Sequence, residues 1–170
     1  MEPMTIQELF ELGMKRRIPK VYMPNRAPFS LIQINVGAGF TEIEGARNLD
    51  LPEWDADIDA IPYDNGTVDV IHAYHFLEHV RDPVRMLQEF QRVLAPGGVI
   101  NIVVPYYTSQ MAAHDLDHKH VFCEETWKNL FNNEYYNKNR INWELKISLN
   151  IIIGIVERNL CLMTQLYKEP

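Results

Sequence analysis

Cysteine is scarce in this sequence, and its scarcity argues against two kinds of small protein. Cys123 and Cys161 are the only two, they lie far apart, and neither belongs to a C-x-x-C pair. A disulfide framework needs more cysteines, and a zinc knuckle needs closely spaced pairs of them. We therefore expect neither structural disulfide bonds nor cysteine-bound zinc, which fits the reducing conditions of the cytoplasm.

An excess of positive charge and a long apolar run are also missing. The chain has 16 Lys and Arg residues against 23 Asp and Glu residues, and Lys15-Arg16-Arg17 is its one basic cluster. A nucleic-acid-binding protein normally carries a basic face, so we expect no nucleic acid as partner. The run IIIGIV at 151–156 is too short to cross a bilayer, and residues 1–17 lack the apolar run of a secretion signal. The sequence thus predicts a cytoplasmic protein with no membrane partner.

What the sequence does contain is enough apolar residues for one α/β domain. Its 170 residues are 46% apolar and 23% charged, as in an ordinary globular protein. Segments of strand length alternate with amphipathic segments of helix length, which favours a mostly parallel sheet with helices on its faces. The expected strands are 31–36, 58–61, 68–73, 99–104 and an antiparallel pair within 143–167; the expected helices are 6–17, 83–94 and 124–132, with an irregular lead-in at 18–30 and a loop at 105–123.

A sharp glycine turn follows the first expected strand. Residues 31–36 read LIQINV, and Gly37-Ala38-Gly39 comes directly after them. Glycine after a buried strand lets the backbone approach a ligand more closely than a Cβ atom would allow. A second short apolar segment then ends on Asp50, where a carboxylate can accept hydrogen bonds from ribose hydroxyls. The pattern indicates a cofactor that contains a nucleoside.

Other polar residues also lie at the ends of expected strands. In a parallel sheet the carboxyl ends meet at one edge, and ligands bind there near the point where the strand order reverses. The segments that reach this edge are Gly37–Gly39, Asp50, Asp59-Ala60, His72-Ala73 and Pro105-Tyr106. We expect them to surround one binding site.

These segments together resemble the class I S-adenosylmethionine-dependent methyltransferases, in their small-molecule, type 11-like branch. The resemblance runs from Ile32 to Pro105 and is carried by INVGAGF, the acid of NLD, DAIPYDNGTVDVI, FLEHVRD and FQRVLAPGGVINIVVP. It implies a Rossmann-like, doubly wound, mostly parallel sheet with an antiparallel C-terminal edge, in a single domain. Within that domain we expect a helix and lead-in at 1–30, a cofactor-binding core at 31–105 and an acceptor-side region at 106–170.

The resemblance implies S-adenosylmethionine as the cofactor and assigns its sugar and methionine parts to matching residues. Gly37, Ala38 and Gly39 would pass beside the methionine and ribose parts. Asp50 would bind the ribose hydroxyls, and His72 would lie where the methionine part rests.

The adenine edge is assigned in the same way. Asp59 would accept a hydrogen bond from the adenine amino group, and the backbone near Ala60 would complete that edge. Asp55 and Asp57 compete for this role because all three acids share the segment DADID.

The sequence departs from the family pattern in the link after the glycine turn. Phe40 stands at the family's third glycine position, and the residues between Gly39 and Asp50 are too few for the usual crossover helix. We therefore expect a shortened turn there, with one thin wall to the cofactor crevice. A nicotinamide-dependent oxidoreductase also has a strand, a glycine turn and an acid in this order. Its G-x-G-x-x-G motif requires a last glycine where this sequence has Glu42, which argues against that class.

All six histidines fall into two windows, 72–79 and 114–120, and each window follows an expected strand end. Histidine titrates near neutrality, so either window could supply a base for methyl transfer. Our candidates for a catalytic role are His79, His118 and His120. A packed core histidine is the ordinary alternative for His79.

The segment HDLDHKH at 114–120 has two interpretations. Its imidazoles and carboxylates could bind a divalent metal, although Lys119 would repel one. The spacing D-x-x-H-x-x-x-F from Asp115 resembles the acceptor-side loop of the family, so we favour a substrate-facing wall without metal. His114, Tyr106 and Tyr107 are then expected to contact the acceptor.

The leading hypothesis is methyl transfer to a small-molecule acceptor. The sequence VPYY at 104–107 differs from the N/D-P-P-Y/F sequence of enzymes that methylate amino groups of nucleobases or glutamine. The alternative is a non-catalytic scaffold or partner subunit with a methyltransferase-like fold. The sequence is also compatible with a homodimer.

Overall fold

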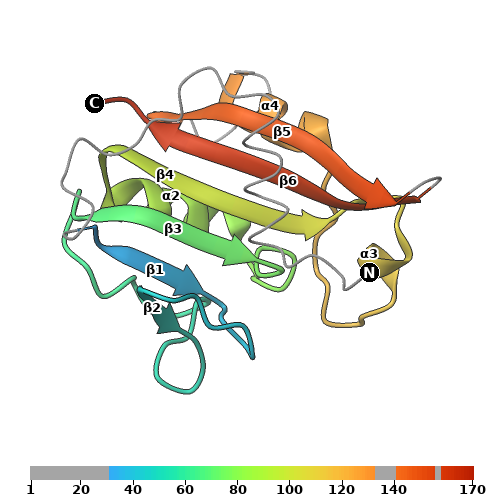
Figure 1. Ribbon diagram of the computed structural model, residues 1–170, viewed down its shortest axis with the longest axis horizontal. Coiled ribbons are helices and arrows are strands. Elements are labelled where there is room, and N and C mark those ends of the chain that lie inside the picture. Colours follow the sequence, from blue (N-terminus) through green and yellow to red (C-terminus); the bar gives the residue numbers. More distant parts are fainter. Residues whose placement is uncertain (1–30, 133–140, 156–157) are drawn as a thin grey trace.

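The computed structural model describes residues 31–132, 141–155 and 158–170, so the helix expected at 6–17 and the lead-in at 18–30 lie outside the described residues. The described chain forms one six-stranded sheet in the order β2-β1-β3-β4-β6-β5 (Figure 1). Its elements are β1 (Gln33–Val36), β2 (Ala46–Leu49), β3 (Val68–Tyr74), α2 (Pro83–Val93), β4 (Leu94–Pro105), α3 (Gln110–Ala113), α4 (Glu124–Asn132), β5 (Leu145–Ile155) and β6 (Arg158–Lys168). No described helix is long and apolar enough to cross a membrane.

The four strands β2, β1, β3 and β4 are parallel; β1, β3 and β4 form the apolar centre of the domain, whereas only Leu49 of β2 is buried. Val36 lies opposite Ala73 of β3, and Ile71 lies opposite Ile100 of β4; all four side chains are buried. Strands with near-continuous apolar residues are typical of a parallel sheet that is covered on both faces. The carboxyl ends of β1, β3 and β4 therefore point to the same edge, as Figure 1 shows.

The antiparallel edge expected at the C-terminus is confirmed. Strand β6 pairs antiparallel with β4, and β5 pairs antiparallel with β6. Leu162 and Leu166 of β6 join the main core, whereas Met163 faces the other side and packs with Val103. The alternation of side chains along β6 thus places apolar groups on both faces of the sheet.

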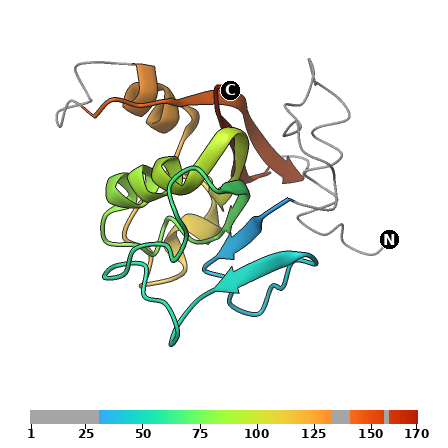
Figure 2. The same ribbon diagram turned by 90° about the vertical axis from the view of Figure 1, so that its left-hand side faces the viewer.

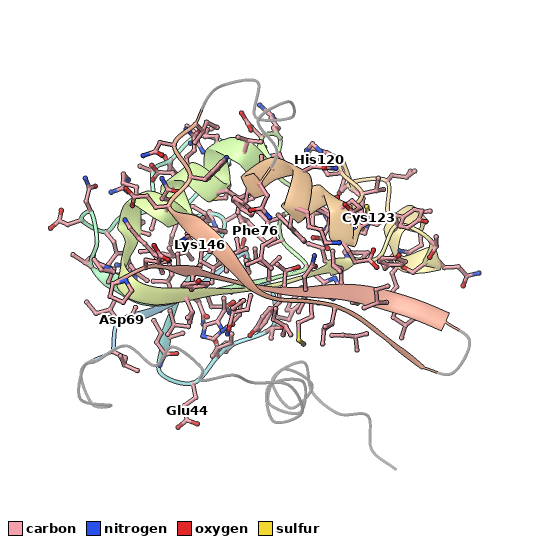
Figure 3. The ribbon with its side chains drawn as sticks, turned by 90° about the horizontal axis from the view of Figure 1, so that it is seen from above. Glu44, Asp69, Phe76, His120, Cys123 and Lys146 are labelled. Atoms are coloured by element: carbon pink, nitrogen blue, oxygen red, sulfur yellow. The ribbon has the colours of Figure 1, made fainter. Side chains whose placement is uncertain are left out.

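Helices α2 and α4 lie on the same side of the sheet, as Figures 2 and 3 show. The Asp82 side chain accepts a hydrogen bond of 2.9 Å from the backbone N–H of Arg85, and Pro83 occupies the first turn, so the predicted cap is confirmed. In α4, Trp127 is buried and its ring stacks on Phe122 at 5.3 Å. Each helix is held mainly by its apolar face.

Three expected boundaries are corrected. Residues 58–61 form no strand: the N–H of Ile58 and of Asp59 donate to the carbonyl of Asp55, so a turn uses the donors that a ladder would need. Helix α2 ends at Val93, and β4 already begins at Leu94, where it pairs with Val68 and continues through the glycines at 97 and 98. The loop expected at 105–123 contains the short helix α3.

The expectation of no regular first crossover helix is confirmed, because residues 37–45 contain only turns and irregular backbone. The N–H of Gly37 donates to Leu49 at 2.9 Å, and the N–H of Thr41 donates to Ala38 at 2.8 Å. The side chain of Asn35 donates to the carbonyl of Thr41 at 2.7 Å. The link therefore closes on itself and leaves the Phe40 side chain fully exposed.

Candidate functional site

A cavity of about 450 Å³ lies at the carboxyl ends of the parallel strands. This volume falls within the range of small-molecule pockets. The cavity is lined by Gly37, Asp50, Leu51, Trp54, Asp55, Ala56, Asp57, His75, Phe76, His79, Val80, Asp117 and Lys119. It therefore joins the glycine turn, the end of β2, the turn after β3 and the loop after α3.

The two glycines of the turn have different surroundings. Gly37 has φ +62°, and a Cβ atom added to it would lie 2.2 Å from Cδ2 of Phe76. Gly39 has φ +51°, and nothing lies within 4 Å of the position its Cβ atom would occupy. Gly37 is thus required by the packing of Phe76, which is buried on the helix side of the sheet (Figure 3), whereas Gly39 leaves open space where a ligand could pass.

Asp50 is half-buried at the end of β2 and links the glycine turn to the backbone that follows β2. Its Oδ2 accepts a hydrogen bond of 2.5 Å from the N–H of Gly39, and its Oδ1 accepts one of 2.8 Å from the N–H of Leu51. A carboxylate has about four acceptor positions, so these two bonds leave capacity for the hydroxyls of a ligand.

The expected adenine-edge residues line a neighbouring hollow of about 630 Å³, which shares Asp50 and Trp54 with the main cavity. Oδ2 of Asp59 accepts a hydrogen bond of 2.8 Å from the N–H of Asp55. The carbonyl of Ala60 accepts one of 3.1 Å from Nε1 of Trp54. Asp59 and Ala60 therefore lie beside the main cavity and not in its wall.

His72 lies apart from the cavity, within β3. Its ring nitrogens contact the hydroxyl of Tyr74 at 3.0 Å and Oε1 of Gln33 at 3.3 Å. Burial lowers the pKa of His72 from 6.5 to about 4, so the side chain is neutral at physiological pH. Ala38 is buried beneath the glycine turn.

The turn after β3 carries the charged groups of the opposite wall. His75 has φ +52°, which is unusual for a residue other than glycine, and its Nδ1 lies 3.2 Å from Oε1 of Glu78. Burial would lower the pKa of His75, but hydrogen bonds to Cys161 and Glu78 outweigh it and raise the pKa to about 9. His75 is therefore protonated at neutral pH and pairs with a carboxylate that is almost completely buried.

The loop after α3 is fixed onto this turn by its backbone. The carbonyl of Glu78 accepts hydrogen bonds from the N–H of Lys119 at 2.7 Å and of His120 at 3.3 Å, and the Lys119 ammonium donates to the carbonyl of His79. The ring centroids of His79 and His118 lie 4.7 Å apart. The structure thus brings His79 and His118 together, two of the predicted catalytic residues.

The third predicted catalytic residue and the acceptor residues point elsewhere. Nε2 of His120 lies 3.0 Å from the carbonyl of Val80, and Nδ1 of His114 lies 2.9 Å from the carbonyl of Met111. The hydroxyl of buried Tyr106 donates to Glu124 at 3.1 Å, while the Tyr107 side chain is exposed. None of these four side chains lines the cavity among the described residues.

Sequence reasoning missed several residues that the cavity uses. Trp54 and Phe76 supply its buried aromatic walls, and Lys119 and Asp117 supply charges from the far loop. A tryptophan closely following the acid of β2 was a usable signal for the first. The position of Lys119 depends on how the distant loop packs, and no local pattern predicts it.

The comparisons with known proteins agree with the fold. Residues 22–102 match a family model described as a methyltransferase domain. A chain of the complex between the Haloferax volcanii Trm112 methyltransferase activator and a candidate methyltransferase has 13% identity and a TM-score of 0.62, covering 95% of this chain and 89% of that one. An Archaeoglobus fulgidus structure described as a SAM-dependent methyltransferase has 17% identity and a TM-score of 0.59, covering 95% and 94%. An Aquifex aeolicus SAM-dependent methyltransferase has 14% identity and a TM-score of 0.55, covering 81% of each chain. At these identities the solved structures show the shared fold.

Proposed function

We propose that this chain, which belongs to the class I S-adenosylmethionine-dependent methyltransferases, transfers a methyl group to a small-molecule acceptor in the cytoplasm. The observation that supports this most is the single cavity shared by the glycine turn, Asp50 and the histidine turn after β3. In a sheet of this type, ligands bind at the carboxyl ends of the strands.

The residues of the first wall fit the family's cofactor, S-adenosylmethionine. The open space beside Gly39 can admit its ribose and methionine parts, and Asp50 has acceptor capacity left for ribose hydroxyls. The buried Trp54 ring offers an apolar surface between the cavity and the hollow next to Asp59 and Ala60. We assign the adenine to that hollow.

S-adenosylmethionine supplies an electrophilic methyl group, so the contribution of the chain is mainly to align the acceptor. His79 lines the cavity, and the ring of His118 packs against the ring of His79. Either imidazole can take the proton that a hydroxyl or amine acceptor loses. His75 cannot serve as this base, because its pKa of about 9 keeps it protonated at neutral pH.

A second candidate is a non-catalytic methyltransferase-like scaffold or partner subunit that binds its cofactor weakly or not at all and acts with a partner protein. The structural similarity to a complex of the Haloferax volcanii Trm112 activator supports it. The thin first wall, with the fully exposed ring of Phe40 and the exposed Leu51, also supports it, because exposed apolar side chains are common at interfaces.

Calorimetric titration with S-adenosylmethionine and S-adenosylhomocysteine, with NADH as the negative control, separates the two candidates. Micromolar binding of the first two alone supports the enzyme and justifies a screen of acceptors. Absence of binding to a protein that circular dichroism shows to be folded supports the partner subunit.

The role of Asp50 is tested by Asp50→Asn, which keeps the side-chain shape but removes the charge. We expect cofactor binding to weaken by about 1–3 kcal/mol, because charge-assisted bonds to the ribose would be lost. Glu125→Gln is the control, since Glu125 is an exposed acid on α4 that pairs with Lys128. If the folded Asp50→Asn protein bound the cofactor as tightly as the Glu125→Gln control, the role assigned to Asp50 would be contradicted.

A further inference from the structure

Three side chains beside the cavity form a group that a base for methyl transfer does not by itself explain. A carboxylate oxygen of Glu78 and one ring nitrogen each of His79 and His118 lie within 4.8 Å of one another. Glu78 and His79 belong to the turn after β3, and His118 belongs to the loop after α3. We propose that these three side chains bind a divalent transition-metal ion.

Glu78 supplies the first argument. Its side chain is only 1% exposed, and its Oε1 is paired with Nδ1 of His75. Its Oε2 is buried and has no hydrogen-bond partner among the described residues. A buried carboxylate oxygen without a partner is costly and uncommon in folded proteins. A bound cation would supply the missing partner.

The histidines supply the second argument. Nδ1 of His118 lies 3.4 Å from the carbonyl of Ala112, which can only accept, so Nδ1 carries the proton and Nε2 keeps its lone pair. A metal-binding histidine usually donates its other ring N–H to a carbonyl or carboxylate in this way. Within the described part of the chain, the imidazole of His79 makes no hydrogen bond, so it too can offer a lone pair.

Two imidazoles and one carboxylate form a donor set that suits zinc and similar ions, with a coordination position left open. Ligand bonds of that type place the donor atoms about 3.3 Å apart, so the present spacing would have to contract on binding. The His118 side chain is only partly buried, so a change of its side-chain torsions can shorten these distances while the loop backbone stays in place. Glu78 is buried and fixed, because its carbonyl holds the N–H groups of Lys119 and His120.

The charged groups around the three side chains are balanced between the two signs. Asp115 lies close to the two imidazoles of the group. The hydrogen bond from the N–H of Asp117 lowers the pKa of the Asp115 carboxyl most, and the imidazoles of His118, His79 and His114 lower this pKa further. Lys119 opposes a cation, but its ammonium donates to the carbonyl of His79. Glu78 and Asp115 carry the negative charges, and Lys119 and the protonated His75 carry the positive ones, so ligand bonds and not net charge would hold the ion.

The metal site goes beyond the proposed methyl transfer and does not depend on it. His79 also lines the cavity, so the open position of the ion would face an acceptor there. An imidazole bound to metal no longer accepts a proton; the ion would instead lower the pKa of an acceptor hydroxyl. Cofactor titration tests the methyltransferase proposal separately.

Cobalt titration of the full-length, chelator-treated protein tests the proposal, because the visible bands of Co²⁺ change when imidazole and carboxylate replace water. We expect one Co²⁺ per chain, displaced by Zn²⁺, and a rise in the unfolding temperature. His118→Ala and His79→Ala should each weaken binding by about tenfold or more. His114→Ala and His120→Ala are the controls, because each removes a histidine of the same loop that lies outside the group; we expect their affinity to stay within about twofold of the parent protein.

The result can overturn the proposal in two ways. Absence of bound Co²⁺ at one equivalent would contradict it, as would an equal loss of affinity in the control variants, which would indicate non-specific binding to surface histidines. Glu78→Gln should also lose binding; if that variant does not fold, the two pairs of histidine variants still decide.

Discussion

The two walls of the cavity are built in different ways. The first wall, residues 37–54, contains the glycine turn and short strand β2, and its link carries no helix. The second wall consists of the turn at 75–80 and the loop at 114–120. In the first wall the exposed Phe40 and Leu51 contribute nothing to the core, whereas the second wall buries Phe76, Leu77 and Glu78.

This difference indicates how binding is divided between the walls. The first wall is joined to the core at Leu49 and Trp54, but its link at 37–45 is held mainly by backbone hydrogen bonds and side-chain bonds such as that of Asp50, so the link can adapt to a ligand. The second wall is anchored in the apolar core and by bonds between segments distant in sequence, such as Lys119 N–H to the carbonyl of Glu78. We infer that the acceptor side is preformed and that the cofactor side adjusts. Leu49 and Trp54 join the first wall to the main core, and Phe76 of the second wall packs directly against Gly37.

Gly37→Ala should therefore produce the largest effect. The new methyl group would lie 2.2 Å from Cδ2 of Phe76, and the backbone would keep a left-handed φ of +62°. We expect the free energy of unfolding to fall by about 2–4 kcal/mol, because overpacking and left-handed strain act together. Urea denaturation followed by circular dichroism measures the change.

Gly39→Ala is the matched control for that experiment. It has a similar φ of +51° but open space around the added methyl group, so only the backbone strain remains, about 1 kcal/mol. Equal losses in the two variants would show that Phe76 does not anchor the first wall.

The protonated His75 of the second wall should make the free energy of unfolding depend on pH. The pKa of His75 is about 9 in the folded protein and 6.5 without its partners, so its contribution is complete below pH 6.5 and is lost as the pH rises through 9. His75→Asn tolerates the left-handed backbone and removes the titration. Between pH 6.5 and 9, we expect the free energy of unfolding to fall by about 1–2 kcal/mol more in the parent protein than in the variant.

Thermal unfolding at a series of pH values compares the two proteins. His114→Asn is the control, because His114 is exposed and its change should leave the pH profile unaltered. Parallel profiles for the parent protein and His75→Asn would show that the ion pair with Glu78 does not form.

Local signals in the sequence predicted much of this fold. The Asp82-Pro83 cap and the apolar period that follows it predicted α2, and Gly37 predicted a tight turn after β1. The shortage of residues before Asp50 predicted the missing crossover helix, because a helix needs a minimum length. Each of these features is decided by neighbours in the chain.

The features that the sequence did not reveal depend on packing between distant segments. Residues 58–61 have an apolar pattern, but the sheet ends at β2 and the Asp55 turn takes their donors. The contact of Phe76 with Gly37 and the meeting of Glu78 with His118 join segments that no local rule connects. The sequence therefore singled out His79, which lines the cavity, but not Glu78, the buried carboxylate beside it.

The smallest expected effect concerns the contact between Asp57, which lines the cavity after the first wall, and Arg81, which follows the turn of the second wall. Asp57 accepts from the backbone N–H of Arg81 at 2.7 Å and pairs with its guanidinium at 3.2 Å. Arg81→Ala removes only the exposed ion pair, so the free energy of unfolding should change by at most about 0.5 kcal/mol. Asp57→Ala also removes the acceptor of the backbone N–H and should cost about 1 kcal/mol. If urea denaturation gave the larger loss for Arg81→Ala, Asp57 and Arg81 would be joined mainly by their charges and not by the backbone hydrogen bond.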